Sequence, residues 1–376
     1  MKNYEQALQK CKAEGTYRTL TTTKSSGKFV QVEGQRLLNL SGNDYLGLLD
    51  APELLDEFLQ TTHNEPLSSA SSRLLSGNDE VYELFERELA ETYGKPSALI
   101  WDSGYHANSG ILPVLALPRT LILADRLVHA SIIDGIRLSG APFKRFRHND
   151  VSHLSQILEQ NCADYDQIWV VTESLFSMDG DFAPLEEIVQ LKRKYPQQVY
   201  IYLDEAHAVG VRGDEGLGYA SELNLLDDID ILVGTLGKAL GSVGAYSLQS
   251  NVLRQLFISK ARPLIFSTAL PPMNISWSHF IFNKQRRMNE RRVHLRALIK
   301  LFSERMGHTY ASQILPIIIP GEEAVTNAAA ELTRQGYYVR PIRKPTVPEG
   351  YERIRLSLTS ALSIDEVEQL ANVLKK

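Results

Sequence analysis

Cysteine is scarce in this chain of 376 residues, which contains only Cys11 and Cys162. Two cysteines so far apart form no disulfide framework and lack the spacing of zinc ligands. No apolar run approaches the roughly twenty residues needed to cross a bilayer, and the charged N-terminal stretch has no apolar signal core. We therefore expect a cytoplasmic protein that holds no metal and does not bind a membrane.

An excess of positive charge is also absent, because 40 lysine and arginine residues face 45 aspartate and glutamate residues. A large nucleic-acid surface needs a basic stripe, so we expect no nucleic-acid partner. Two motifs for nucleotide binding are also absent. The stretch "GTLGKALGS" around Lys238 lacks the first glycine and the Ser or Thr of a P-loop, and "GDEGLG" at 213–218 has its glycines at the wrong offsets for a dinucleotide fold.

Short apolar runs alternate with helical segments through the middle of the chain. This order predicts an α/β fold with a mainly parallel sheet, and runs that are apolar on both faces suit buried parallel strands. From about residue 274 the pattern changes to one long charged helix over 282–306, followed by short strands and helices. We expect an N-terminal arm (1–40), a large α/β domain (41–274) and a small C-terminal α+β domain (275–376). The apolar runs are "SALIWD", "TLILAD", "QIWVVTE", "QVYIYLDE" and "IDILVGTL".

Polar residues follow these runs at the point where each predicted strand ends. Open α/β sheets bind ligands outside the carboxyl ends of their strands. Each residue alone fits a helix cap, a structural hydrogen-bonding group or a surface amine, but one shared site accounts for all of them together. The strand-end residues are Asp102 with Ser103 and Gly104, Asp125 with His129, Glu173 with Ser177, Asp204 with His207, and Thr235 with Lys238.

This set of groups matches what pyridoxal 5'-phosphate (PLP) requires. PLP needs a lysine for its aldehyde carbon and an acid beside its ring nitrogen, which Lys238 and Asp204 can supply. His207 is placed to reach the phenolic oxygen, and His129 to stack on the ring. Gly237 and Gly241, on either side of Lys238, predict a main chain that lets the amine move. A helix N-terminus can hold the phosphate, and the candidates there are Thr235, Ser103, Gly104 and Tyr105.

Several stretches, in order, resemble the α-oxoamine synthases, which are fold-type I PLP enzymes that condense an amino acid with an acyl thioester and release carbon dioxide. The resemblance runs from about Tyr17 to the C-terminus. It implies a large domain with a mainly parallel seven-stranded sheet, a smaller domain, and a homodimer whose subunits share their active sites. The stretches are "SGNDYLGL", "ADRLVHASIIDGIRLSG", "FSMDGDFAPL", "DEAHAVGVRGDEGLG" and "GTLGKALGSVGAY".

The resemblance also implies roles for individual residues. Lys238 would carry the cofactor, Asp204 would pair with the pyridine nitrogen, and His129 would stack on the ring. His207 and Ser177 would lie at the phenolic oxygen. Thr235 would bind the phosphate, and Ser267 or Thr268 would reach the phosphate of the second subunit. The residues implied for the substrate are Arg355 at its carboxylate, Asn43 nearby and Arg18 at the acyl entrance.

Three further stretches are most similar to the family members that use L-alanine and a pimeloyl thioester in biotin biosynthesis. Coenzyme A and acyl carrier protein both remain open as the acyl carrier. Glycine with acetyl-CoA and serine with a long acyl thioester remain open as substrates, as do an aminotransferase, a carbon–carbon lyase and a silent binding subunit on the same fold. The stretches are "FKRFRHNDVSHL", "VVTESLFSMDGDFAPL" and "RKPTVPEGYERIRLSLTSA".

Departures from the family pattern fall in residues 68–82. Ser68, Ala70 and Ser71 replace glycines, and Tyr82 replaces a histidine, which leaves the acyl-chain specificity open. We further expect Arg353 to be a surface residue, and the basic stretch 285–296 to be a solvated helix face rather than a carrier site.

Overall fold

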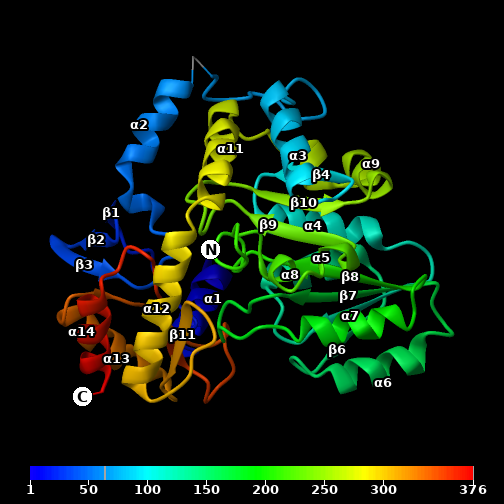
Figure 1. Cartoon of the computed structure of the whole chain (residues 1–376). Helices are drawn as coiled ribbons and strands as arrows, with labels where there is room; N and C mark the ends of the chain where they lie inside the picture. The colour runs from blue at the N-terminus through cyan, green and yellow to red at the C-terminus, as the bar shows by residue number, and fades with distance from the viewer. Residues whose placement is uncertain (63–64, 376) are drawn as a thin grey trace. The chain divides into compact units, whose positions relative to one another are not determined.

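The computed structural model describes residues 1–62 and 65–375 (Figure 1). By their contacts they form two compact units. Unit 2 comprises Pro52–Ser177 and Asp181–Arg292, and unit 1 comprises Met1–Ala51, Met178–Gly180 and Val293–Lys376. The domain borders expected after residues 40 and 274 stay a prediction; by contacts, the chain changes unit after residues 51 and 292, and briefly at 178–180.

The sheet of unit 2 has, within the described part of the chain, seven strands in the order β4-β10-β9-β8-β7-β5-β6. Strand β10 is antiparallel to β4 and β9, and the other neighbours pair in parallel. The predicted mainly parallel, seven-stranded α/β fold is therefore confirmed. Most strand residues are buried, which explains the continuous apolar runs. The strands are β4 (Ser97–Trp101), β5 (Thr120–Asp125), β6 (Phe143–Phe146), β7 (Gln167–Glu173), β8 (Val199–Asp204), β9 (Ile231–Thr235) and β10 (Ala245–Gln249).

Helices surround this sheet in Figure 1. Helix α4 (Gly104–Leu115) packs on β4, β9 and β10 and is buried along most of its length. Helix α5 (Ala130–Ser139) crosses it closely, since a Cβ on Gly135 would lie 2.4 Å from the Asn108 carbonyl oxygen. The remaining helices of unit 2 are α2 (Pro52–Thr61), α3 (Glu80–Thr92), α6 (Val151–Asn161), α7 (Leu185–Arg193), α8 (Tyr219–Glu222), α9 (Asn251–Lys260), α10 (Arg262–Phe266) and α11 (Pro272–Arg286).

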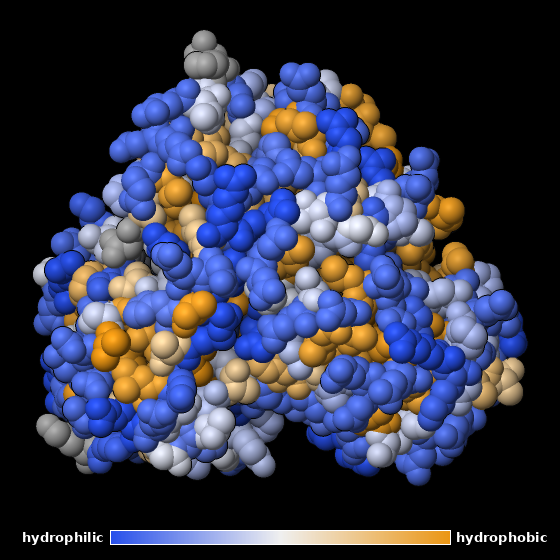
Figure 2. Space-filling view, in the orientation of Figure 1, coloured by the Kyte–Doolittle hydropathy of each residue, from blue (hydrophilic) through white to orange (hydrophobic). Residues whose placement is uncertain are grey.

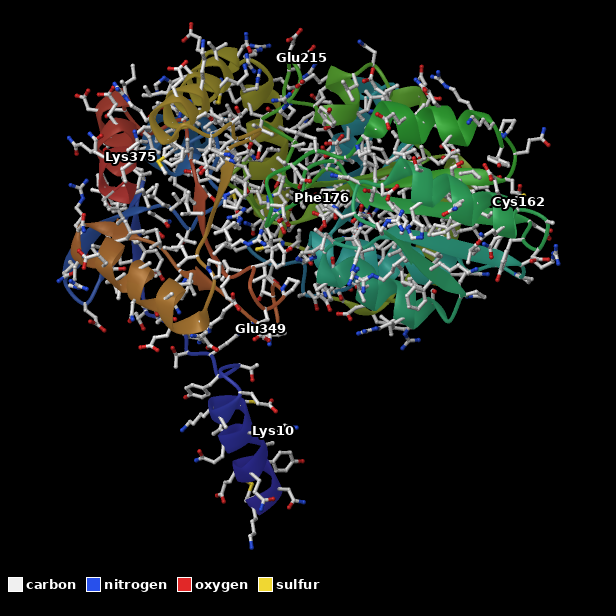
Figure 3. All side chains as sticks on the ribbon, turned by 90° about the horizontal axis from the view of Figure 1, so that it is seen from below. Lys10, Cys162, Phe176, Glu215, Glu349 and Lys375 are labelled. Atoms are coloured by element: carbon white, nitrogen blue, oxygen red, sulfur yellow. The ribbon has the colours of Figure 1, made fainter. Side chains whose placement is uncertain are left out.

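Unit 1 joins the two terminal segments of the chain. Its first sheet, β1-β2-β3-β12, pairs β3 in parallel with β12, and its second has the order β11-β14-β13. No residue of α1 is buried, and this helix, which carries Lys10, is drawn at the bottom of Figure 3. The elements are α1 (Lys2–Ala13), β1 (Lys24–Ser26), β2 (Phe29–Val32), β3 (Gln35–Asn39), β11 (Ile314–Ile318), α13 (Glu322–Arg334), β12 (Tyr337–Tyr338), β13 (Pro341–Ile342), β14 (Arg353–Ser357) and α14 (Ile364–Leu374).

The single helix expected over 282–306 is wrong. Helix α11 ends at Arg286, and α12 (Asn289–Met306) begins three residues later. The fully buried Arg292 donates to the carbonyl oxygens of Gln285 and Arg286, at 2.7 and 3.0 Å. Carbonyl groups at a helix end lack intrahelical partners, so Arg292 stabilises the break.

Two arginines of the basic stretch 285–296 form ion pairs within unit 2. The Arg286 guanidinium lies 2.6 Å from Glu215, and that of Arg291 lies 4.0 Å from Glu53. These ion pairs and the burial of Arg292 leave less basic charge for a carrier, and the solvated helix face stays a prediction.

Hydrophilic residues cover most of the face drawn in Figure 2, with smaller hydrophobic patches between them. Among the residues that the structure describes, no helix is both long and apolar enough to cross a membrane. Over the same residues, no group of three or more His, Cys, Asp or Glu side chains is arranged to hold a metal ion.

Candidate active site

The strand ends singled out in the sequence lie at one edge of the large sheet. Strands β5, β7, β8 and β9 are parallel neighbours, and β4 runs in the same direction because both β4 and β9 are antiparallel to β10. Their carboxyl ends therefore bring Asp102, Asp125, Glu173, Asp204 and Thr235 to the same edge, where open sheets bind ligands.

Lys238 lies in a tight turn directly after β9. The Gly241 amide donates to the Lys238 carbonyl oxygen and the Ser242 amide donates to the Leu236 carbonyl oxygen, both at 2.9 Å. Gly241 has a φ of +58°, which favours glycine. Gly237 has no left-handed φ, and a Cβ there would approach only to 3.6 Å. The main chain is thus braced, and movement of the amine must come from the long side chain itself.

The Lys238 amine points to the residues after β8. Its Nζ lies 2.9 Å from Nε2 of His207. His207 and Asp204 are each only 6% exposed. Oδ1 of Asp204 accepts a hydrogen bond from the Ala206 amide at 2.9 Å, which fixes the carboxylate in this loop. A half-buried amine thus lies beside a buried imidazole and a buried carboxylate.

Asn108 of α4 holds the other oxygen of that carboxylate, and the sequence interpretation missed it. Its Nδ2 lies 2.9 Å from Oδ2 of Asp204, and its Oδ1 accepts from the Tyr202 hydroxyl at 2.6 Å. The signal available was an amide in the middle of the apolar stretch "ANSGIL". A polar side chain that is buried there needs partners.

His129 caps the N-terminus of α5. Its Nδ1 lies 2.7 Å from Oγ of Ser131, and its amide donates to Oε1 of Glu173 at 2.6 Å. Loss of hydration lowers the pKa of His129; the Asp204 carboxylate opposes this shift and Lys238 adds to it. Burial, together with Asp204, raises the pKa of Glu173 well above its usual value. The neutral imidazole is the favoured form of His129 near pH 7.

The candidate phosphate groups surround the start of α4 and the Lys238 turn. Oγ of Ser103 accepts from the His106 amide at 3.1 Å, so this serine is the helix cap. A side chain at Gly104 would meet nothing within 4 Å, and the Tyr105 hydroxyl bonds to Asp134. Oγ1 of Thr235 accepts from the Gly237 amide at 3.3 Å and donates to the Gly244 carbonyl oxygen at 3.2 Å. The first amides of a helix are natural anion ligands.

Ser177 and Thr268, two other predicted cofactor residues, lie in loops of unit 2. Ser177 is half-buried and directly precedes the 178–180 segment. Thr268 is exposed and follows α10, while the neighbouring Ser267 hydrogen-bonds to the Asp102 carboxyl.

His148 bridges two carboxylates beside this loop, and the sequence interpretation missed it. Its Nδ1 lies 2.9 Å from Asp125 and its Nε2 lies 2.8 Å from Asp181. Burial opposes its charge, but these two hydrogen-bonded carboxylates prevail and raise the pKa of His148 to about 10. Phe176, labelled in Figure 3, packs edge-on against the ring at 4.4 Å between centroids. Through His148, Asp125 is linked to Asp181 and so helps to hold the loop that contains Phe176 and Asp181.

Arg355, the predicted carboxylate ligand, belongs to unit 1. Its guanidinium donates to Asn43 Oδ1 at 3.2 Å, to the Tyr45 hydroxyl at 3.1 Å and to Ser357 Oγ at 2.7 Å. Tyr45 donates in turn to Asn43 at 3.0 Å. Burial raises the pKa of Tyr45, although Arg355 works against that shift. These hydrogen bonds fix the direction of the Arg355 guanidinium.

Arg353 is not the surface residue expected from the sequence. It is 3% exposed, and its guanidinium lies 2.6 Å from Asp179 and 3.0 Å from the Met178 carbonyl oxygen. The expectation was wrong because the partner comes from a segment some 170 residues away, which no local pattern reveals. Arg18, the predicted acyl-entrance residue, is exposed and donates to Thr346 at 3.1 Å.

Ser69 and the departure Tyr82, both in the stretch 68–82, bond to the segment that carries Thr268. Oγ of Ser69 and the Tyr82 hydroxyl both donate to the Leu270 carbonyl oxygen, at 2.8 and 3.0 Å. Ala70 has a φ of +47°, a conformation that a glycine adopts more easily. At Ala70 the backbone therefore keeps a conformation typical of glycine, although the residue is alanine.

These groups fit PLP. The buried Asp204 carboxylate suits a protonated pyridine nitrogen, the Lys238 amine suits the aldehyde carbon, and the N-terminus of α4 suits a phosphate. The donors belong to one unit and one sheet edge. Fold and donor set together define a PLP-dependent enzyme of fold-type I.

Known proteins agree with this class. The model of the aminotransferase class I and II family matches residues 35–374. A protein of Neisseria meningitidis serogroup A, named "Putative 8-amino-7-oxononanoate synthase", is 49% identical, with 99% of each chain covered. A serine palmitoyltransferase structure from S. paucimobilis with bound PLP and myriocin is 26% identical, with a TM-score of 0.88 over 99% of this chain and 96% of that one. The structure of an 8-amino-7-oxononanoate synthase from Francisella tularensis is 26% identical, with a TM-score of 0.74 over 90% of this chain and 96% of that one.

The chain therefore belongs to the aminotransferase class I and II family. Within that family it is a full-length relative of proteins named as 8-amino-7-oxononanoate synthases, and it is a PLP-dependent enzyme of the acyltransferase type.

Proposed function

We propose that this enzyme condenses L-alanine with a pimeloyl thioester to give 8-amino-7-oxononanoate, carbon dioxide and free thiol, in biotin biosynthesis. The observation that carries the proposal is the buried cluster at the end of β8 and β9, in which Lys238 Nζ lies 2.9 Å from His207 and Asp204 is held three residues away from His207. The full-length relatives that bear the name of this activity support the choice of substrates.

When bound, PLP supplies a carbon electrophile and a ring that withdraws electrons from the α-carbon of an amino acid. Lys238 would hold the cofactor through its amine, and the same amine would act as the base that takes the proton from the α-carbon of the amino acid. Asp204 would pair with the pyridine nitrogen. His207, 2.9 Å from the Lys238 amine, and Ser177 would bind the phenolic oxygen, and His129 would stack on the ring.

The phosphate is held at the N-terminus of α4, by Ser103 and the amides of Gly104 and Tyr105, together with Thr235. The open space at Gly104 supports this placement. Thr268 contributes to the phosphate site of a second subunit.

Arg355 binds the carboxylate of the amino acid, with Asn43 beside it, and Arg18 borders the acyl entrance. The contacts among Arg355, Asn43 and Tyr45 support this role, because they fix the direction of a guanidinium, which binds carboxylates well. A fixed carboxylate sets which bond of the α-carbon breaks.

The proposed reaction balances without an oxidant or reductant. The α-carbon of alanine forms a bond to the thioester carbonyl carbon, the carbon–sulfur bond breaks, and the thiol leaves with a proton. The alanine carboxylate then leaves as carbon dioxide, and the α-carbon takes up a proton to give the amino ketone. Coenzyme A and acyl carrier protein are both chemically adequate carriers.

The enzyme acts as a homodimer under this proposal. Several large apolar side chains of unit 2 are exposed, and four of them lie within or directly beside the stretch 68–82 or the segment that carries Thr268. Exposed apolar groups of this size favour a protein partner, and a second copy of the chain is the occupant we propose. The four are Leu67, Leu74, Leu75 and Phe266. Light scattering should give the dimer mass, and a monomer at micromolar concentration would contradict the proposal.

Cofactor attachment and activity test the function. The purified protein should absorb in the visible range after addition of PLP, and borohydride should fix PLP to a peptide that contains Lys238. Lys238→Ala should abolish both, whereas Lys300→Ala, at an exposed lysine of α12, should change neither. Thiol release with pimeloyl-CoA should require alanine. A wild-type protein that takes up no PLP, or that releases no thiol with alanine and either carrier, would refute the function.

A second candidate is the condensation of serine with a long-chain acyl thioester. The TM-score of 0.88 to the serine palmitoyltransferase, against 0.74 to the synthase from Francisella tularensis, is the observation that favours it. Competing alanine, glycine and serine with pimeloyl-, acetyl- and palmitoyl-CoA separates the candidates through the mass of the amino ketone formed.

A further inference from the structure

A directed chain of hydrogen bonds links Asp204 to His129 through two buried side chains. Asn108 is 1% exposed and Ser131 is fully buried. Nδ2 of Asn108 donates to Oδ2 of Asp204 and to Oγ of Ser131, both at 2.9 Å. Oγ of Ser131 lies 2.7 Å from Nδ1 of His129. The acid and the imidazole, from different elements, thus share one amide.

The carboxylate of Asp204 fixes the orientation of this amide. A carboxylate only accepts hydrogen bonds, so the amino group of Asn108 must face it. The Tyr202 hydroxyl, 2.6 Å from Oδ1 of Asn108, then donates to the carbonyl oxygen. A flipped amide would set an oxygen against Oδ2 of Asp204 and leave Ser131 without its donor. The second N–H of Asn108 therefore points to Ser131.

The tautomer of His129 follows from the direction of these hydrogen bonds. Oγ of Ser131 accepts from Asn108, which leaves its own proton for Nδ1 of His129. The Ser131 amide also donates to Nδ1, at 3.3 Å. Two donors aimed at Nδ1 require a lone pair there, so the proton of the neutral ring must lie on Nε2.

We propose that Asn108 and Ser131 are positioning residues that hold His129 as the neutral Nε2–H tautomer and link the position of its ring to the Asp204 carboxylate. The proposal rests on the proposed function only in assigning His129 to the face of PLP and Asp204 to its ring nitrogen. The hydrogen bonds themselves lie within the protein.

The surroundings of His129 are compatible with this neutral form. Asp204 and Asp134 favour a positive charge on the ring and Lys238 disfavours it, with desolvation as the largest influence against the charge. The His129 amide is occupied by Glu173. Because Nδ1 is engaged by donors, protonation of the ring must first break the bond from the Ser131 hydroxyl, which disfavours the charged form further.

Close contact between α4 and α5 makes the chain possible. Gly135 of α5 has no side chain, and a Cβ at this position would clash with the Asn108 carbonyl oxygen. The two helices can therefore approach until Nδ2 of Asn108 reaches Ser131, one turn before Gly135.

Nuclear magnetic resonance of the full-length protein labelled with 15N-histidine tests the proposal, with and without PLP. The His129 signals are assigned by their loss in His129→Gln. The wild type should show an unprotonated Nδ1 and a protonated Nε2 across the neutral pH range in both states. Ser131→Ala should give a mixture of tautomers and move ionisation of His129 to higher pH, and Ser131→Thr, which keeps the hydroxyl, should restore the wild-type pattern.

Activity and cofactor binding supply the second readout. Loss of one hydrogen bond in the chain should lower kcat/KM about tenfold in Ser131→Ala while PLP is retained. Asn108→Leu should lower it more, because it also frees Oδ2 of Asp204. Ser139→Ala is the matched control: it lies on the same helix, and its hydroxyl donates to the Ile136 carbonyl oxygen instead.

An unchanged tautomer and an unchanged ionisation of His129 in Ser131→Ala would overturn the proposal, whatever the activity of that variant. The tautomer is read without substrate, so a protein that makes no amino ketone would refute the proposed function and still decide this one. If Asn108→Leu fails to fold, Ser131→Ala with its threonine rescue carries the test alone.

Discussion

Replacing His148 by phenylalanine should destabilise unit 2 in a way that depends strongly on pH. The substitution keeps an aromatic ring against Phe176 but removes both hydrogen bonds to carboxylates. Asp125, fully buried, would then face Asp181 without the positive charge between them. Asp125 keeps its bonds from the Leu127 and Asn149 amides, at 2.7 and 2.9 Å, so the loop can still form.

The magnitude follows from the pKa of His148. A rise from 6.5 to about 10 corresponds to about 5 kcal/mol of favourable interaction of the charged ring. Removing one partner of a buried ion pair costs about 3–5 kcal/mol, and because Asp181 is 40% exposed and water screens its attraction, we expect the lower part of this range. Because the folded-state pKa lies above the unfolded value, the stabilisation is complete below about pH 6.5 and is lost as the pH rises through about 10.

Urea unfolding followed by tryptophan fluorescence measures this effect, because Trp101, Trp169 and Trp277, all the tryptophans of the chain, lie in unit 2. The difference in unfolding free energy between wild type and His148→Phe should shrink by about 1.4 kcal/mol per pH unit between pH 7 and pH 10. The exposed His308 provides the control, since His308→Phe should give a small difference at every pH. A His148→Phe difference that stays constant from pH 7 to 10 would refute the reasoning.

Three further substitutions have definite expected outcomes. Arg355→Lys loses the guanidinium contacts to Asn43 and Tyr45 and should raise KM for the amino acid about tenfold or more with unchanged PLP absorbance; an unchanged KM would contradict its role. Arg353→Leu leaves the Asp179 carboxylate without its arginine partner and should lower the unfolding free energy by about 3 kcal/mol in thermal unfolding. The double variant Arg353→Leu with Asp179→Leu should lose less unfolding free energy than Arg353→Leu alone. Gly234→Ala places a Cβ 2.2 Å from the Tyr246 ring and should cost about 1–3 kcal/mol; a neutral result would show that the ring can move.

The large sheet and the position of the strand-end residues that we propose for the cofactor follow from the sequence, because their signals are local. A buried parallel strand is a short apolar run, and its carboxyl end carries the functional residue, as at Asp204 and Thr235. Because parallel strands run in the same direction, the position of each residue at the end of its strand is enough to place both at one edge of the sheet.

Other parts of the site depend on contacts between segments that are far apart in the sequence, and local sequence patterns do not predict such contacts. Arg353 looks like any charged residue in a strand until Asp179 is placed beside it, and His148 until Asp125 and Asp181 flank it. Asn108 is one polar residue in an apolar helix, and only the fold shows that it serves two functional groups. The break after Arg286 is equally hidden, because helix propensity runs through it and a buried arginine from the next helix stabilises it.

The assembly of unit 1 from both terminal segments has a consequence for synthesis on the ribosome. Strand β3 pairs with β12, in which Tyr337 lies opposite Leu38, and β14 includes Arg355, which bonds to Asn43. Domains generally form as the chain emerges, and nearly all of unit 2 is present once residue 292 has been made. The edge of β3 must therefore wait for almost three hundred further residues. During that interval an unpaired strand edge is open to wrong partners, so this chain stays exposed to aggregation through most of its translation.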